Sequence, residues 1–263
     1  KSKMRKLIDT IKNIWNIEDL RNRILVTLGI LAIYRLGSFV VIPGVDVAKL
    51  TLQNDTSSGL LGLLNMFTGG AFANASIFAL GIMPYISASI VIQLLGMAIP
   101  YFQKLQKEGE SGRKKINNMT RWLTILITAG QAPGYIATQI TNRAGAVPDA
   151  GMLWWSTTIL LLITGTMFVM WLGEKITDRG IGNGISLIIM IGIIANLPQA
   201  FLQEFTSALG LGGAQMVGFF VEILALLFVI LVTILLVQGT RRIPVQYAKR
   251  VVGNKQYGGV RQF

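Results

Sequence analysis

The sequence contains no cysteine and no histidine among its 263 residues. Disulfide bonds, zinc sites built from cysteine and histidine, histidine-ligated haem and a cysteine nucleophile are therefore excluded. A Ser-His-Asp triad is excluded for the same reason. We expect no bound metal and no cofactor.

Charged residues are also scarce: they make up 14% of the chain, where soluble globular proteins carry about 25%. Hydrophobic residues make up 52%, which argues against a water-soluble domain of this length. The charge that remains is lopsided, because 24 Lys and Arg oppose 12 Asp and Glu and leave a net charge of +12. Such a chain either binds nucleic acid or spans a membrane with its basic residues on one side.

Long apolar runs favour the membrane. A spanning helix needs about 20 mostly apolar residues, and we expect six spans, at 24–42, 75–99, 122–141, 152–173, 181–202 and 216–238. The third and fifth are the weakest, because Gln131, Pro133 and Asn183 interrupt them. Pro84 removes a backbone donor from the second span, so we expect a kink there.

The basic residues divide cleanly between the two sides of such a membrane protein. Twenty-one of the 24 fall in the segments 1–23, 100–121, 174–180 and after 238, which lie on one side if six helices alternate. The other side has only Lys49 and Arg143. The positive-inside rule then places both termini and the two long basic loops in the cytoplasm.

Two apolar segments are too short to span. Residues 4–18 repeat apolar side chains every three or four positions, which predicts an amphipathic helix that lies on the cytoplasmic membrane surface or packs on a partner protein. Residues 59–72 form a short apolar run broken at Gly69 and Gly70. This run is typical of a re-entrant helix beside an outward-facing cavity, or of a short surface helix in the external loop.

The glycine-rich segment 179–185 resembles a dinucleotide-binding loop only superficially, because no strand precedes it and an apolar span follows. Close helix packing or a flexible helix start is the better interpretation. Two pairs at GxxxG spacing, Gly130 with Gly134 and Gly180 with Gly184, would let helices approach closely.

Arg35 and Glu222 are the only charges within the predicted spans, and such charges are often functional. Arg35 lies in the outer half of its span, where it can reach the membrane surface. Glu222 lies within two turns of its helix end. No Asp lies within a span, so an aspartyl protease pair is excluded. A secondary transporter built on broken helices is the alternative function.

Isoleucines four residues apart, Ile82 with Ile86 and Ile185 with Ile189, would share a helix face. Spacing alone favours ordinary packing. The 100–121 loop and the tail after 238 are basic with interleaved aromatic residues. Such segments can contact anionic lipid headgroups or RNA phosphates.

Several longer motifs resemble the SecY family, whose members are central subunits of the bacterial protein-conducting channel. They are YRLGSF and PGVD (34–39 and 43–46), NMFTGGA (65–71), ASIFALGIMPYISASIVIQLL (75–95), EGESGRKKIN (108–117), GEKITDRGIGNGIS (173–186) and RRIPVQYAKR (241–250). The motifs occur in the family's order and cover nearly the whole chain.

The resemblance implies an all-α polytopic membrane bundle and not an enzyme. The family has ten transmembrane helices in two inverted halves, and this chain would cover helices one to six. The implied divisions are a cytoplasmic helix (1–20), the first half of the channel (21–203), an external loop with the sixth helix (204–238) and the start of a basic cytosolic loop (239–263).

The resemblance also implies roles for residues. The implied pore ring is Ile82, Ile86, Ile185 and Ile189; a ring of branched apolar side chains limits ion leakage by dewetting. The implied plug is the segment at 59–72, namely Leu60, Leu61, Leu63, Leu64, Asn65, Met66, Phe67, Thr68, Gly69 and Gly70. The implied lateral gate includes Ser87, Ile90 and Gln93, and the implied contacts with the ribosome or the SecA motor are Arg241, Arg242, Lys249 and Arg250.

The implied function is to pass unfolded secretory proteins across the membrane and to release transmembrane segments sideways into it. The implied partners are the SecE and SecG subunits, SecA or the ribosome with its RNA, signal peptides, nascent chains and membrane lipids. The implied location is the bacterial cytoplasmic membrane, with the N-terminus in the cytoplasm.

Overall fold

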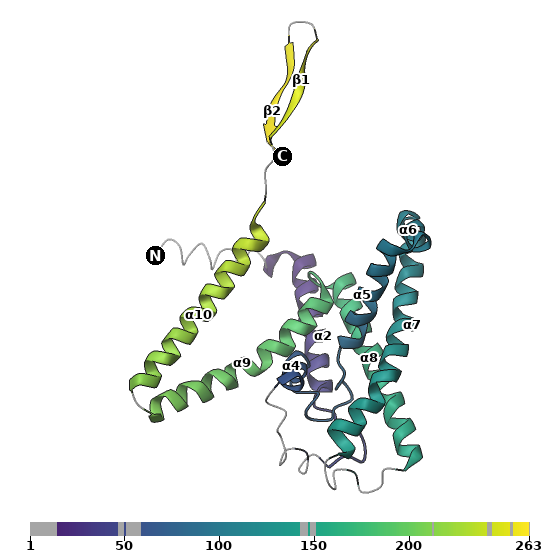
Figure 1. The fold of residues 1–263 in the computed structure, drawn as a ribbon, viewed down its shortest axis with the longest axis vertical. Helices are drawn as coiled ribbons and strands as arrows, with labels where there is room; N and C mark the ends of the chain where they lie inside the picture. The colour runs from purple at the N-terminus through teal and green to yellow at the C-terminus, as the bar shows by residue number, and fades with distance from the viewer. Residues whose placement is uncertain are drawn as a thin grey trace. The chain divides into compact units, whose positions relative to one another are not determined.

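A computed structural model describes residues 15–46, 50, 59–142, 147, 151–211, 213–240, 244–252 and 255–262 (Figure 1). The elements are α2 (Glu18–Gly37), α4 (Gly59–Phe67), α5 (Met83–Ala98), α6 (Pro100–Lys107), α7 (Glu110–Tyr135), the π-helical turn η1 (Ile136–Thr141), α8 (Met152–Arg179), α9 (Gly184–Leu211), α10 (Gly213–Gln238), β1 (Pro244–Val252) and β2 (Lys255–Gln262). Of the amphipathic helix predicted at 4–18, only 15–18 is described. The chain divides into two compact units, 1–198 and 199–263.

The first unit is a helix bundle in which α5, α7 and α8 pack against one another and α2 packs against α8. The packed face of α7 carries a column of buried threonines, Thr120, Thr124 and Thr128. Each hydroxyl donates to the carbonyl four residues earlier in the same helix. These small side chains therefore need no partner on another helix, which lets neighbouring helices approach closely.

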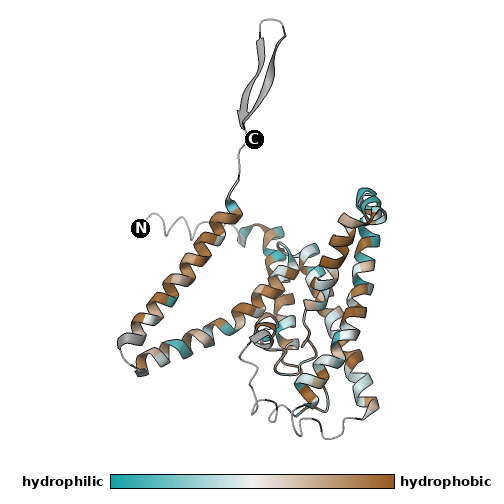
Figure 2. Cartoon of the chain, viewed as in Figure 1, coloured by the Kyte–Doolittle hydropathy of each residue, from teal (hydrophilic) through white to brown (hydrophobic). Residues whose placement is uncertain are grey.

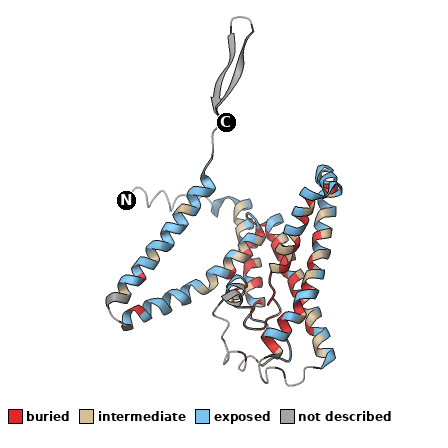
Figure 3. Cartoon of the chain, viewed as in Figure 1, coloured by how far each residue is buried: buried red, intermediate tan, exposed pale blue. Residues whose placement is uncertain are grey.

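Buried residues, red in Figure 3, are concentrated in this unit, and most of the apolar ones form two clusters. The first joins Phe72 and Ala79 of the segment before α5 to Tyr135 of α7 and Ile136 of η1. The second joins α2, α5, α8 and α9 and contains Tyr34, Phe78, Ile82, Leu172, Ile176 and Ile188. The segment 68–82 contributes to both clusters and so connects them.

The bend predicted at Pro84 of α5 lies elsewhere in the structure. Pro84 lies in the first turn of α5, where a missing N–H has no cost because those groups lack an acceptor within the helix. The expected kink at Pro84 is therefore wrong. The chain bends by 100° at the other end of α5, between α5 and α6. Pro100 disfavours helical backbone at the residue before it, and Ile99 is extended, with φ −110° and ψ 123°.

Three helices within the described ranges are long and apolar enough to cross a membrane: Met152–Arg179, Gly184–Gly210 and Met216–Gln238. The α5–α6 pair qualifies only as a bent span. These correspond to four of the six predicted spans. The other two correspond to α2 and to α7, which begins at Glu110, inside the segment predicted as a loop. The count of six remains a prediction.

The second unit contains the end of α9, all of α10 and both strands. Phe219 of α10 packs against Phe201 and Phe205 of α9, with ring centroids 5.4 and 5.7 Å apart. The rest of α10 is mostly apolar (Figure 2), with Glu222 as its one charged residue. No residue in its most apolar stretch is buried, against 44% of that of α8. A helix that is hydrophobic all round is typical of a membrane span.

The segment predicted as part of a basic loop contains an antiparallel hairpin, so the all-α description lacks one element. β1 pairs with β2 from Pro244 opposite Gln262 to Val252 opposite Lys255, with a register shift between Tyr247 and Arg250. Two residues, Gly253 and Asn254, separate the strands in the sequence. A Gly-Asn pair between two runs containing valine and tyrosine is a hairpin signal that the sequence reading missed.

Candidate functional site

The short helix α4 ends in a glycine-based cap. Gly70 N–H donates to the carbonyl of Asn65 at 2.9 Å, and Gly69 N–H donates to that of Met66 at 3.1 Å. These are the two hydrogen bonds of a Schellman motif. Gly69 and Gly70 have φ of +65° and +92°, a backbone region that glycine enters without steric cost. The Gly-Gly pair therefore ends α4 and turns the chain.

Two side chains of the same motif stabilise the turn that follows. Thr68 Oγ1 accepts the N–H of Phe72 at 3.2 Å, and Asn65 Oδ1 accepts the N–H of Ala73 at 3.0 Å. Thr68 is buried, as are Ala71 and Phe72. The NMFTGGA motif thus folds back on itself, with its polar side chains satisfying the backbone of a buried turn.

Two side chains from other helices hold this turn from outside. Arg35 of α2 donates from Nη1 to the carbonyl of Gly69 at 2.7 Å. Tyr135 of α7 donates from its buried hydroxyl to the carbonyl of Phe72 at 2.8 Å. The rings of Tyr135 and Phe72 also meet edge to face, with centroids 5.0 Å apart. Sequence reasoning did not identify these tethers; the charge of Arg35 within an apolar span was the signal for one of them.

A close backbone contact joins the same turn to α9. A Cβ placed on Gly192 would lie 2.6 Å from the carbonyl oxygen of Phe67, and a Cβ placed on Gly69 would lie 3.1 Å from Gly192 Cα. Any larger residue at Gly192 would collide with the end of α4. The short helix therefore ends directly against α9.

The four isoleucines singled out in the sequence belong to one apolar cluster. Ile82, the residue before α5, is buried within it, and Ile86, Ile185 and Ile189 pack against it half-buried. Ile189 also lines a shallow apolar groove on α9. The structure thus brings together residues about 100 positions apart in the sequence.

Half of the described α4 residues are exposed and half are half-buried. Leu63, Met66 and Phe67 are exposed, whereas Thr68 is buried. Leu64 and Asn65 are half-buried. Leu60 and Leu61 lie in α4, but their side chains are outside the described part of the chain. The predicted plug therefore consists of a partly exposed helix and a mostly buried cap.

A cavity of about 370 Å³ opens between the turn after α4, α5 and α7. Its lining includes Ser87 of α5, one of the three residues assigned by resemblance to a lateral gate. Ile90 is exposed. Gln93 is also exposed, and its Nε2 donates to Ser89 Oγ at 3.3 Å. The three residues lie on the same helix, but only Ser87 lines the cavity.

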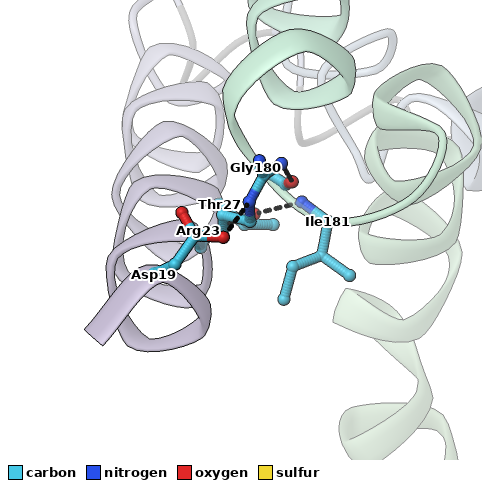
Figure 4. A network of polar contacts seen from close by, with 5 residues as sticks. All are labelled: Asp19, Arg23, Thr27, Gly180 and Ile181. Carbon is cyan, nitrogen blue, oxygen red and sulfur yellow. Dashed lines mark hydrogen bonds and ion pairs between the residues drawn. The ribbon is translucent and has the colours of Figure 1, made fainter. Parts of the chain in front are cut away.

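The glycine-rich connection between α8 and α9 is fastened to α2 (Figure 4). Thr27 Oγ1 accepts the N–H of Ile181 at 3.1 Å and donates to the carbonyl of Arg23 at 2.8 Å. Arg23 also pairs with Asp19 at 3.2 Å and reaches toward the carbonyl of Gly180 at 3.5 Å. A Cβ on Gly180 would collide with Thr27 Oγ1, so close packing explains that glycine.

The two GxxxG pairs differ in their surroundings. A Cβ on Gly184 would collide with the carbonyl of Gly173, whereas Gly130 and Gly134 have no described atom within 4 Å of such a Cβ. The prediction of close packing is therefore confirmed for Gly180 with Gly184 and is wrong for Gly130 with Gly134 among the described residues.

The two basic segments singled out in the sequence are described to different extents: 100–121 completely, and the tail after 238 in part. Arg121 of α7 pairs with Glu174 of α8 at 2.6 Å. Lys249 and Arg250 lie in β1, but their side chains, like Arg241 and Arg242 as a whole, fall outside the described residues.

The bundle, the short capped helix and the surrounding spans define a polytopic helical membrane protein. The SecY family model matches residues 76–263. The chain is 44% identical over 252 residues to the protein translocase subunit SecY of Streptomyces scabiei, covering 92% of this chain and 57% of the relative. It is 46% identical over 246 residues to that of Escherichia coli K12, covering 91% and 54%. The chain belongs to the SecY family, and it spans about half the length of these relatives.

Solved structures agree on the fold. A structure of a protein conducting channel superposes with a TM-score of 0.58 at 20% identity, covering 92% of this chain and 52% of that chain. Sec61 in the canine ribosome-channel complex from the endoplasmic reticulum gives a TM-score of 0.58 at 20% identity, covering 86% and 49%.

Proposed function

We propose that this chain forms the first part of a protein-conducting channel that passes unfolded secretory proteins across the membrane and releases transmembrane segments sideways. One observation carries the proposal: Ile82, Ile86, Ile185 and Ile189 lie in one apolar cluster, and the same α9 that supplies two of them also contacts the end of α4. Branched apolar side chains can surround a moving polypeptide without offering it hydrogen bonds, and a dewetted constriction resists ions.

In this proposal, α4 and its cap are the plug of the resting channel. The nine residues of α4 are too few to span a membrane, and their exposed side chains leave little packing to lose when α4 moves. The cavity beside Ser87 supports a role for this side of α5 in lateral release. The partners would be SecE, SecG, SecA or the ribosome, signal peptides, nascent chains and lipids. The location would be the bacterial cytoplasmic membrane, with a cytoplasmic N-terminus.

The experiment is site-specific photocrosslinking to a stalled secretory chain in membranes that hold the protein with its partner subunits. Probes at Ile86 and Ile185 should crosslink to the stalled chain. Matched probes at Leu126 of α7 and Leu160 of α8, which are both exposed but lie outside the isoleucine cluster, should not. Crosslinks of equal strength at all four positions, or none at Ile86 and Ile185, would contradict the proposal.

A further inference from the structure

The guanidinium group of Arg35 occupies an unusual position for a charge in an apolar helix. Arg35 is half-buried on α2. Its Nη1 donates to the carbonyl of Gly69 at 2.7 Å, and its Cζ lies 4.9 Å from the centre of the Phe39 ring. The group is thus held by a carbonyl and an aromatic face, an arrangement that stabilises a cation away from bulk water.

The carbonyl that Arg35 binds belongs to the cap of α4. A helix C-terminus carries a partial negative charge from its unsatisfied carbonyls, and a cation there is stabilising. A Cβ on Gly69 would lie 2.9 Å from Arg35 Nη1. Glycine at this position therefore permits both the left-handed turn and the close approach of the guanidinium.

The hydrogen bonds from Arg35 and Tyr135 are made to carbonyls on opposite sides of Gly70 in the sequence. Arg35 binds the carbonyl of Gly69, on the side of α4, whereas Tyr135 binds the carbonyl of Phe72, in the buried turn. Both Gly69 and Gly70 have positive φ. Breaking the first tether would remove the bond from α2 that holds the end of α4, while the second would keep the turn in the core.

We propose that Arg35 is a positioning residue that latches the plug helix in its docked place. This rests on the proposed function of α4 as a plug. Arg35 acts through the Gly69 carbonyl and the helix end, and Gly192 provides the surface against which the helix end rests. Opening then requires the guanidinium to leave that carbonyl.

The test is hydrogen exchange by mass spectrometry on the protein in its own membrane vesicles, with its accompanying subunits. Arg35→Met removes the charge and the donors. We expect exchange at 64–70 to become at least about tenfold faster, because hydrogen bonds to charged groups are among the stronger ones. Exchange at 77–81 and in α8 should stay unchanged, because the amides of Ile77, Ala79 and Gly81 bond to carbonyls outside 64–70. Arg121→Met, which removes an arginine ion pair elsewhere, should leave 64–70 at the unsubstituted rate.

Conservative variants distinguish a latch from general loosening. Arg35→Lys keeps the charge and should stay closer to the unsubstituted protein than Arg35→Gln, which keeps a donor without the charge. If Arg35→Met also accelerates exchange in α8, the comparison of Arg35→Lys with Arg35→Gln decides whether the charge of Arg35 holds α4. Equal exchange in the two variants, or equal acceleration at 64–70 and at 77–81, would overturn the latch.

A second measurement tests the Arg35 proposal separately from the proposed sealing function of α4. Ion leak across the same vesicles should rise in Arg35→Met if the plug seals a pore. Faster exchange at 64–70 without more leak would leave the latch standing and contradict the sealing function. Unchanged exchange would overturn the latch whatever the leak.

Discussion

Two adjacent stretches, α4 and the segment 68–82, have similar apolar composition but opposite surroundings. Leu63, Met66 and Phe67 of α4 are exposed, whereas Thr68, Phe72 and most of the residues up to Ile82 are buried. The described side chains of α4 are exposed or half-buried. The segment after it is mostly buried, and Tyr135 of α7 bonds its backbone. The comparison shows a partly exposed helix joined to a buried segment through the glycine pair.

The largest expected difference in the free energy of unfolding is between alanine substitutions at two phenylalanines five residues apart. Phe72→Ala removes a buried ring from the cluster around Tyr135 and should lower the free energy of unfolding by about 3–5 kcal/mol. Phe67→Ala, at an exposed ring on α4, should cost less than about 1 kcal/mol. Thermal or denaturant unfolding in detergent, followed by circular dichroism, measures both. Equal losses would show that α4 is as firmly packed as the segment after it.

A smaller effect is expected where α4 meets α9. Gly192→Ala places a methyl group 2.6 Å from the Phe67 carbonyl, and such overpacking typically costs about 1–3 kcal/mol. Hydrogen exchange should accelerate in α4 more than in α8. Gly130→Ala is the matched control, since its Cβ meets no described atom and alanine favours an exposed helix. If the two variants behave alike, the contact of α4 with α9 does not restrain it.

The smallest effect concerns the tether on the other side of Gly70. Tyr135→Phe removes the hydroxyl that donates to the Phe72 carbonyl and should lower the free energy of unfolding by about 1–2 kcal/mol, because a buried acceptor loses its donor. Exchange should rise at 71–76 while 64–67 changes little. Tyr101→Phe, at an exposed tyrosine, is the control. A rise confined to α4 would mean that Tyr135 restrains α4 and not the segment 68–82.

The sequence predicted helix positions best where a long apolar run by itself requires a helix. Helices α8, α9 and α10 appear where long apolar runs predicted spans, because backbone groups in a membrane must be satisfied within the helix. The long motifs identified the family. Local rules also located a glycine break at Gly69 and Gly70, where α4 ends.

Predictions that depended on tertiary contacts with other helices were less accurate. Pro84 was expected inside a helix and lies at its start, since the residues before it pack in the core as irregular chain. Gly130 and Gly134 have the same spacing as Gly180 and Gly184, yet only the second pair packs closely: Gly180 lies against Thr27 Oγ1 and Gly184 against the Gly173 carbonyl. The sequence prediction lacked the hairpin of β1 and β2, because the positive-inside rule accounts for the basic charge of that segment without requiring strands.

The sequence by itself determined the apolar helices, the family and the places where the chain must turn, because these follow from residue type and local backbone energetics. Only the tertiary structure decided what Arg35 does. Its position in an apolar run allowed it to reach the membrane surface, but the structure directs its guanidinium to the Gly69 carbonyl. That contact joins positions 34 residues apart, and no local rule specifies which helix end a distant charge will meet.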